Sequence, residues 1–353
     1  MEVFDQMIKV AINSLPLKSG HKTRGIGTYT RSLLSSLNKR IDVKIQEFSQ
    51  ISEVKNADLI HFPFFDLFQR TLPPKRKFPT VVTVYDTTPL LFPEHYPPGF
   101  RGKVNLFFQK KALRGVDAVI TVSDVSKGDI SKYLGVNTGK IYPIHLAPAD
   151  HFKVLNDKKL LNGLKKKYRL PENFALYMGS VNWNKNLINL AQACVEEGID
   201  LVLAGKDFED RSKLDHPERK NYREFLQKFS DDPKVHILGF IPGEELVGIV
   251  NLANVTLLPS FYEGFGLPIL ESQICGTPVI TSNASSMPEV AGEGALLVNP
   301  YEVGSIRSAL RKIFDERDAS SSLVKKGFEN VKKFSWEKTA EQTVDVYKRV
   351  LNK

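Results

Sequence analysis

The stretch from residue 254 to residue 282, NVTLLPSFYEGFGLPILESQICGTPVITS, predicts a strand, a glycine-rich loop, a helix and a second strand. Its two ends are short runs of aliphatic and β-branched residues, which are typical of strands buried on both faces. Pro268 suits the first turn of a helix, where its missing N–H leaves no hydrogen bond unmade. We therefore expect a helix over residues 268–276, closed by Gly276, that joins two parallel strands.

The same alternation of strands and helices recurs along nearly the whole chain. Strand-like runs occupy twelve segments: 8–13, 43–48, 57–62, 80–86, 117–123, 140–146, 174–180, 200–205, 234–240, 254–260, 277–282 and 294–299. Helical patterns lie between them, and the first places four apolar side chains on one stripe: Tyr29, Leu33, Leu34 and Leu37. Strands separated by helices predict parallel sheets, and there are too many strands for one open sheet.

We therefore predict an α/β protein of two facing domains, each built on a parallel sheet. A composition break at residues 151–172 separates them. We place the first domain at residues 1–160 and the second at 170–335, with a C-terminal helix over 336–353 that packs back towards the first domain. In open α/β sheets ligands bind beyond the C-terminal ends of the strands, so the cleft between the domains is the expected site.

The composition is that of a soluble globular protein, since 42% of the 353 residues are hydrophobic and 25% are charged. The two cysteines, Cys194 and Cys275, encode neither a disulfide framework nor a zinc site, and the N-terminal apolar run is too short for a signal peptide. We expect a cytoplasmic protein. The net charge of +9 favours ligands that carry phosphate or an anionic membrane surface. No nucleic-acid motif accompanies this charge, so we expect no nucleic-acid partner.

Two glutamates flank the glycine-rich loop of the opening stretch. Glu263 is expected in the loop and Glu271 about one turn into the helix, so both can face the cleft from one strand–loop–helix corner. The glycines leave backbone N–H groups exposed beside the positive helix N-terminus, which suits hydroxyl or phosphate oxygens. Carboxylates at such a corner accept hydrogen bonds from a polyol, such as a ribose or a sugar ring. The alternative is a tight turn with a helix-capping glutamate.

Residues 257–300 extend this pattern through the Glu-x7-Glu spacing, GFGLP, CGTPVI, PEV, GEGA and a closing NP. Here the chain resembles the family-four retaining glycosyltransferases (glycosyl transferases group 1) of the GT-B fold. The nearest subgroup is that of bacterial mannosyl- or rhamnosyltransferases of surface-polysaccharide assembly. Further matching segments lie along the chain: 24–34, 82–94, 116–130, 176–187 and 238–246.

The resemblance implies an enzyme that moves a hexose, with mannose favoured, from a nucleotide-diphosphate sugar to a saccharide or lipid-linked acceptor. It implies two Rossmann-like domains, the N-terminal one on the acceptor side and the C-terminal one binding the donor. It also implies that the reaction needs no metal and no cofactor besides the donor substrate.

Carried over by position, the resemblance also implies roles for individual residues. Glu263 would contact hydroxyls of the donor sugar near the reacting centre, Glu271 would hold the ribose, and Lys185 would stabilise the departing diphosphate. Asp86 would position or deprotonate the acceptor hydroxyl, although an aspartate there also suits helix capping. Six backbone positions would approach the sugar and the diphosphate: Gly25, Gly27, Gly264, Phe265, Gly266 and Leu267.

The chain departs from the family pattern near two of these residues. Ser180 and Asn184 stand where the family usually places an arginine with its lysine, and Tyr85 replaces a histidine that often precedes the aspartate. A catalytically weak protein that binds sugar nucleotides is therefore one alternative, and a sugar phosphorylase or nucleotide-sugar epimerase on the same fold is another. His61 and His145 end strands and could line the acceptor side, but a lone histidine is more often structural.

A basic and apolar segment at residues 100–115 predicts a further helix. One set of side chains is expected to pack on the sheet: Val104, Phe107, Phe108 and Leu113. A basic set is expected on the other side: Arg101, Lys103, Lys110, Lys111 and Arg114. The alternative is a membrane-surface helix that brings a peripheral enzyme to a lipid-linked acceptor at the inner face of an anionic membrane.

Overall fold

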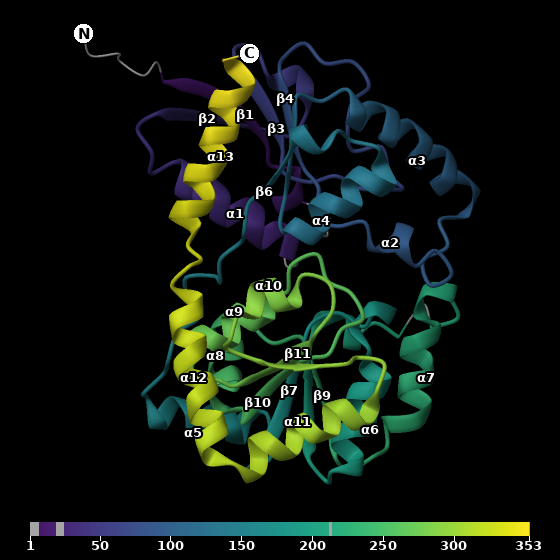
Figure 1. Cartoon of the computed structure of the whole chain (residues 1–353), viewed down its shortest axis with the longest axis vertical. Helices are drawn as coiled ribbons and strands as arrows, with labels where there is room; N and C mark the ends of the chain where they lie inside the picture. Colours follow the sequence, from purple (N-terminus) through teal and green to yellow (C-terminus); the bar gives the residue numbers. More distant parts are fainter. Residues whose placement is uncertain (1–6, 19–24, 212–213, 353) are drawn as a thin grey trace. The chain divides into compact units, whose positions relative to one another are not determined.

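The computed structural model describes residues 7–18, 25–211 and 214–352, which form two compact units (Figure 1). Unit 1 holds the chain up to Pro93, Pro98–Ala147 and the chain from Phe334 onwards. Unit 2 holds Glu94–Pro97 and Pro148–Lys333. Each unit contains a parallel sheet of six strands, which confirms the predicted α/β fold with two parallel sheets.

The sheet of unit 1 has the strand order β2-β1-β3-β4-β5-β6. Its strands are β1 (Ile8–Asn13), β2 (Val43–Phe48), β3 (Leu59–Phe62), β4 (Thr80–Thr83), β5 (Ala118–Thr121) and β6 (Ile141–Pro143). Its helices are α1 (Gly25–Leu37), α2 (Thr88–Leu91), α3 (Gly99–Arg114), α4 (Asp124–Asp129) and α13 (Trp336–Leu351). Because all neighbouring strands are parallel, their carboxyl ends meet at one edge of the sheet.

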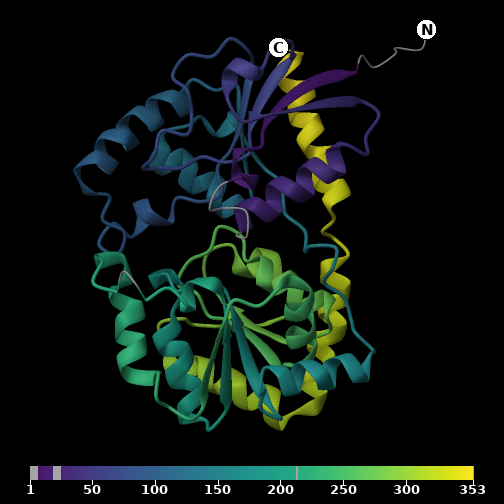
Figure 2. The ribbon, with the colours of Figure 1, turned by 180° about the vertical axis from the view of Figure 1, so that it is seen from behind.

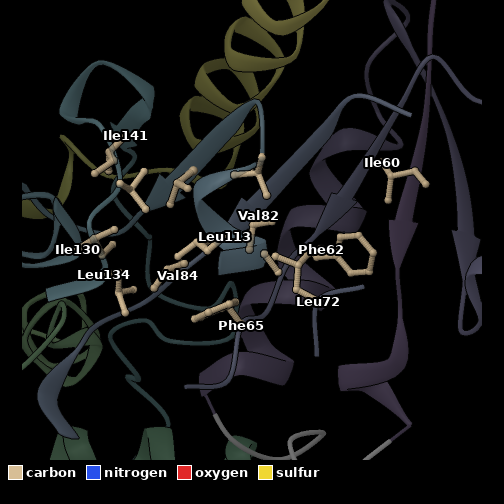
Figure 3. Close-up of a cluster of buried hydrophobic side chains, with 14 of the residues drawn as sticks. Ile60, Phe62, Phe65, Leu72, Val82, Val84, Leu113, Ile130, Leu134 and Ile141 are labelled. Carbon is tan, nitrogen blue, oxygen red and sulfur yellow. The ribbon is translucent and has the colours of Figure 1, made fainter. Parts of the chain in front are cut away.

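The core of unit 1 packs around the middle of this sheet. Strands β3, β4 and β5 are buried along their whole length, as parallel strands covered on both faces must be. Figure 3 shows side chains from one cluster of this core, in which Phe62 and Val82 of the sheet pack with Leu113 of α3 and with Phe65 and Leu72. The loop after β3 therefore contributes to the core together with the sheet.

The C-terminal helix α13 packs against α1 within unit 1 (Figure 1 and Figure 2). Its Tyr347 hydroxyl lies 2.7 Å from Nδ1 of His61, whose Nε2 lies 2.8 Å from Oγ1 of Thr83. His61 is fully buried, and the loss of water lowers the pKa of its ring to about 3. His61 is therefore a neutral, structural residue that ties α13 to the sheet. The carbonyl of His145 accepts a 2.7 Å hydrogen bond from Thr339 of the same helix.

Helix α3 faces the opposite way from the predicted packing. Its buried residues are Gly102, Gln109, Ala112 and Leu113. Three of the four side chains that were expected in the core are exposed, with fractions of 37%, 66% and 47% for Val104, Phe107 and Phe108. The prediction that this stripe packs on the sheet is therefore wrong, apart from Leu113. The polar side chain of Gln109 can be buried in place of the expected apolar stripe because its amide donates hydrogen bonds to the loop after β3. The acceptors are the carbonyl oxygen of Asp66 and the hydroxyl oxygen of Thr71.

The sheet of unit 2 has the order β12-β11-β10-β7-β8-β9. Its strands are β7 (Phe174–Met178), β8 (Asp200–Ala204), β9 (Val235–Gly239), β10 (Val255–Leu258), β11 (Val279–Ser282) and β12 (Leu296–Val298). Its helices are α5 (Lys158–Lys167), α6 (Leu187–Glu196), α7 (Lys220–Phe229), α8 (Gly243–Leu252), α9 (Leu267–Ile274), α10 (Met287–Ala291), α11 (Val303–Asp315) and α12 (Arg317–Val331). Strands β11, β10 and β7 are neighbours, so the loops that follow them meet at one edge.

None of the helices among the described residues is both long enough and apolar enough to cross a bilayer.

Candidate functional site

The corner between β10 and α9 forms as the opening stretch predicts. Strand β10 ends at Leu258, and α9 begins at Leu267 with Pro268 in its first turn. Gly266 precedes the helix with φ of +106°, a left-handed conformation that side chains disfavour. An added Cβ there would also come within 3.1 Å of the Ile269 side chain. Gly266 therefore allows the loop to turn tightly into α9, and its neighbours keep their backbone close to the helix N-terminus.

Glu263 lies in this loop and forms an ion pair with Lys185. The lysine Nζ lies 2.6 Å and 2.8 Å from the two carboxylate oxygens, and the hydroxyl of Ser260 donates to one of them at 2.7 Å. Lys185 ends a short 3-10 helix, Trp183–Lys185, that follows β7. The side chains of Lys185 and Glu263 are only 19% and 10% exposed, so a cation and a carboxylate are held at close range in a partly dehydrated position.

The backbone of the loop is fixed by two serines that follow β11. The hydroxyls of Ser285 and Ser286 donate to the carbonyl of Glu263 at 2.6 Å and 2.8 Å. Ser286 also donates to the carbonyl of Phe265 at 2.9 Å. Loops after three neighbouring strands, β7, β10 and β11, therefore build one site at the carboxyl edge of the sheet in unit 2.

Asparagines around Lys185 hold these loops together. Asn184 is buried, and its side-chain amide donates to the carbonyl of Tyr262 at 2.7 Å. The backbone carbonyl of Asn184 accepts a hydrogen bond from the N–H of Phe261 at 2.7 Å. Asn186 donates to the carbonyls of Pro259 and Pro300 at 2.9 Å and 2.7 Å. The residue that stands in place of an arginine of the family is thus a buried link between the loops that carry Lys185 and Glu263.

The segment Glu94–Pro97 contributes a further contact to this part of unit 2. The hydroxyl of Tyr96 donates to Oδ1 of Asn184 at 2.6 Å and lies 3.3 Å from the N–H of the same residue. Sequence reasoning missed Tyr96 because 88 residues separate it from Asn184 and no local pattern marks the pair.

A stack of aromatic rings runs beside the asparagines. The ring of His95 stacks on Trp183 with centroids 3.6 Å apart, and Trp183 stacks on Phe261 at 4.8 Å. Phe261 stacks on Tyr301 at 4.8 Å. Trp183 and Phe261 each lie two residues before a member of the ion pair, so the stack restrains the same two loops.

Glu271 lies about one turn into α9, in a different environment from Glu263. Its carboxylate makes no hydrogen bond or ion pair with the described residues, and the surrounding protein removes enough water to raise its pKa to about 7. Its side chain is nevertheless partly exposed. A carboxylate without a protein partner at this position is available to accept hydrogen bonds from a ligand hydroxyl.

The remaining predicted residues lie in unit 1. The described part of α1 begins at Gly25 and includes Gly27, and beyond its own helix and chain neighbours no described residue lies within 4 Å of a Cβ added at Gly25. Asp86 follows β4, and its Oδ1 accepts a 2.8 Å hydrogen bond from the N–H of Thr88, two residues further along the chain, in an Asx turn before α2. The hydroxyl of Tyr85 donates to the carbonyl of Pro63 at 2.9 Å. The structure thus gathers Lys185 and the β10–α9 residues in one unit and places Gly25, Gly27 and Asp86 in the other.

Among the described residues, no group of three or more histidine, cysteine, aspartate or glutamate side chains is arranged to hold a metal ion.

Comparison with known families decides the class of the protein. A family model described as Glycosyl transferases group 1 matches residues 164–330, and one described as Glycosyltransferase Family 4 matches residues 45–147. Together they match well over half of the chain. The chain belongs to this glycosyltransferase family. It is therefore an enzyme of the glycosyltransferase class, and the resemblance found in residues 257–300 is confirmed.

Curated relatives of this family member include mannosyltransferases. O-antigen chain mannosyltransferase B of Escherichia coli is 29% identical over 285 residues, which make up 78% of this chain and 71% of that protein. The serotype-specific mannosyltransferase WbdA of Escherichia coli is 28% identical over 77% of this chain, but the match spans only 34% of that protein.

Solved structures confirm the GT-B glycosyltransferase fold. Sucrose-phosphate synthase from Thermosynechococcus elongatus has a TM-score of 0.76 at 21% identity, over 98% of this chain and 99% of that one. HepE of Anabaena in complex with UDP-glucose has a TM-score of 0.71 at 15% identity, over 97% of this chain and 100% of that one. At such identities the likeness establishes the fold alone.

Proposed function

We propose that this glycosyltransferase moves a hexose, with mannose favoured, from a nucleotide-diphosphate sugar to a saccharide or lipid-linked acceptor with retention of configuration. The observation that carries the proposal is the ion pair of Lys185 and Glu263, together with the carboxylate of Glu271 in the helix that follows the same loop, which has no hydrogen-bond or ion-pair partner among the described residues. The mannosyltransferase relatives support the sugar.

The donor would lie along the β10–α9 corner. Glu271 would accept hydrogen bonds from the ribose hydroxyls, because none of the described residues makes a hydrogen bond or ion pair with its carboxylate oxygens. The backbone N–H groups of Gly264, Phe265, Gly266 and Leu267 would approach the sugar and the diphosphate near the helix N-terminus. The UDP-glucose bound to HepE, a protein of the same fold, supports a nucleotide sugar as the ligand.

Lys185 would stabilise the leaving group. When the bond between the anomeric carbon and the diphosphate oxygen breaks, negative charge moves onto the phosphates, and a cation fixed nearby lowers the barrier. The ammonium group of Lys185 is paired with the carboxylate of Glu263. Binding of the diphosphate would draw Lys185 towards the phosphates. Glu263 would then accept hydrogen bonds from sugar hydroxyls. With charge met in this way, we propose that neither a metal nor a cofactor is needed.

Transfer would form a bond between an acceptor oxygen and the anomeric carbon on the face that the diphosphate leaves. The proton of the acceptor hydroxyl would pass to the departing phosphate oxygen, which keeps atoms and charge balanced. In unit 1, Asp86 would orient that hydroxyl, and Gly25 and Gly27 would offer backbone to the diphosphate. We also propose that the enzyme works in the cytoplasm, with peripheral contact to the membrane that carries a lipid-linked acceptor.

A donor panel tests the reaction. Calorimetric titration with nucleotide-diphosphate hexoses should identify one that binds. Incubation of that donor with saccharide acceptors should release the nucleotide diphosphate. The anomeric configuration of the new glycosidic bond should be the same as that of the donor. Inversion at the anomeric carbon would overturn the retaining proposal. Turnover that requires inorganic phosphate would replace it with a phosphorylase.

A further inference from the structure

Helix α3 presents aromatic and aliphatic side chains to solvent. Phe100 is 83% exposed, and three other exposed apolar residues share its face, since they lie four, seven and eight positions further along the helix: Val104, Phe107 and Phe108. Large apolar side chains gathered on one exposed face mark an interaction site, whereas single ones scattered over a surface need no explanation.

The orientation of α3 is fixed from its other side. Gly102, Gln109 and Leu113 are buried against unit 1, and the guanidinium of Arg76 donates to the carbonyl of Ala112 at 3.0 Å. Arg114 donates to the carbonyl of Leu134 at 3.1 Å, so it anchors the end of the helix. The aromatic face therefore cannot turn inwards without breaking these contacts.

The charge of the same helix is entirely positive. Residues 99–114 contain five basic side chains and no acidic one. Lys103 and Lys111 are exposed and lie at helical spacing from Phe100 and Phe107, so cations alternate with rings on the exposed face. Lysines beside aromatic residues are typical of helices that lie in the interface of an anionic membrane, where the rings enter the acyl boundary and the ammonium groups meet lipid phosphates.

We propose that the exposed face of α3 is a docking surface for an anionic lipid bilayer. A second copy of the chain fits it poorly, because a two-fold contact would bring the five positive charges of one α3 against those of the other. The surface supplies a means for the membrane contact proposed above. The test of this proposal measures binding to vesicles and not hexose transfer. The protein can therefore fail to bind vesicles and still transfer a hexose, or bind vesicles and transfer none.

Co-sedimentation with vesicles tests the surface, using phosphatidylcholine with or without phosphatidylglycerol. The wild type should bind only the anionic vesicles. The Phe100→Ser/Phe107→Ser variant should bind at least about ten-fold more weakly, because it lacks two aromatic rings whose burial in lipid would favour binding. The Lys103→Gln/Lys111→Gln variant should lose about five-fold in affinity for each lysine at low salt. High salt should reduce the difference between this variant and the wild type.

Matched controls come from the opposite edge of the same unit, near strand β2. Ile41 is 94% exposed, so Ile41→Ser removes an equally accessible apolar side chain. Lys39→Gln/Lys44→Gln removes the same charge. Both controls should bind vesicles as the wild type does. The proposal is overturned if the wild type stays in the supernatant, if the controls weaken binding as much as the α3 variants, or if light scattering shows a dimer that Phe100→Ser/Phe107→Ser abolishes.

Discussion

Removal of the Tyr96 hydroxyl should disturb the proposed catalytic centre around Lys185 through Asn184. In Tyr96→Phe the ring remains, but Oδ1 of Asn184 loses its 2.6 Å donor and the N–H of Asn184 loses a 3.3 Å acceptor. Asn184 is only 6% exposed, so water replaces these contacts poorly. Two neutral hydrogen bonds at about 0.5–1.5 kcal/mol each predict a loss of about 1–3 kcal/mol in the free energy of unfolding of unit 2.

Urea unfolding followed by fluorescence can measure this loss, because each unit carries one of the two tryptophans, Trp183 and Trp336. The transition reported by Trp183 should shift. Since Asn184 adjoins Lys185, we also expect kcat to fall about ten-fold with little change in donor affinity, as a misplaced catalytic group predicts. Tyr301→Phe is the control, because it removes a hydroxyl from a ring of the same stack that is 63% exposed. If Tyr96→Phe matches Tyr301→Phe in stability and kcat, the link through Asn184 does not position the lysine.

Three further outcomes follow from the site. Glu271→Ala should weaken donor binding by about 1–3 kcal/mol, and an unchanged calorimetric affinity would exclude contact with the ribose. Because burial raises the Glu271 pKa to about 7, this residue's contribution to stability is present below its unfolded value of 4.5 and is lost as pH rises through 7, so Glu271→Gln should flatten that part of the pH–stability curve. Activity should persist in excess EDTA, and its abolition with recovery on added Mg²⁺ or Mn²⁺ would show that Lys185 alone does not meet the diphosphate charge.

The corner that carries the site could be predicted because its signals are local. Pro268 and Gly266 define the start of α9 within a few residues, and the strands on either side are recognisable by their own composition. The proximity of Glu263 to Lys185 was accessible only through the family resemblance, since 78 residues separate them. The start of α9 follows from the local backbone preferences of proline and glycine, whereas the proximity of Glu263 to Lys185 depends on tertiary packing.

The orientation of α3 could not be predicted because a helical stripe shows which side chains share a face but does not show what covers it. Val104, Phe107 and Phe108 were expected to pack on the sheet, yet they are exposed. The buried side of α3 instead includes Gln109, whose amide donates to the carbonyl of Asp66 in the loop after β3. A buried amide with distant partners leaves no trace in local sequence. Asn184 is the same case, since its role depends on Tyr96 and Tyr262.

The most direct test of the central claim is the rate of hexose transfer by Lys185→Met, measured beside Lys185→Arg and the wild type. A panel that includes GDP-mannose and UDP-glucose supplies the donor, and calorimetry gives its affinity in each variant. We expect the wild type to transfer a hexose and Lys185→Met to lose about 10²–10³-fold in kcat, the scale for one lost electrostatic contact to a leaving group. Lys185→Arg should keep a measurable part of the rate because the charge remains. Equal kcat for Lys185→Met and the wild type would contradict the account.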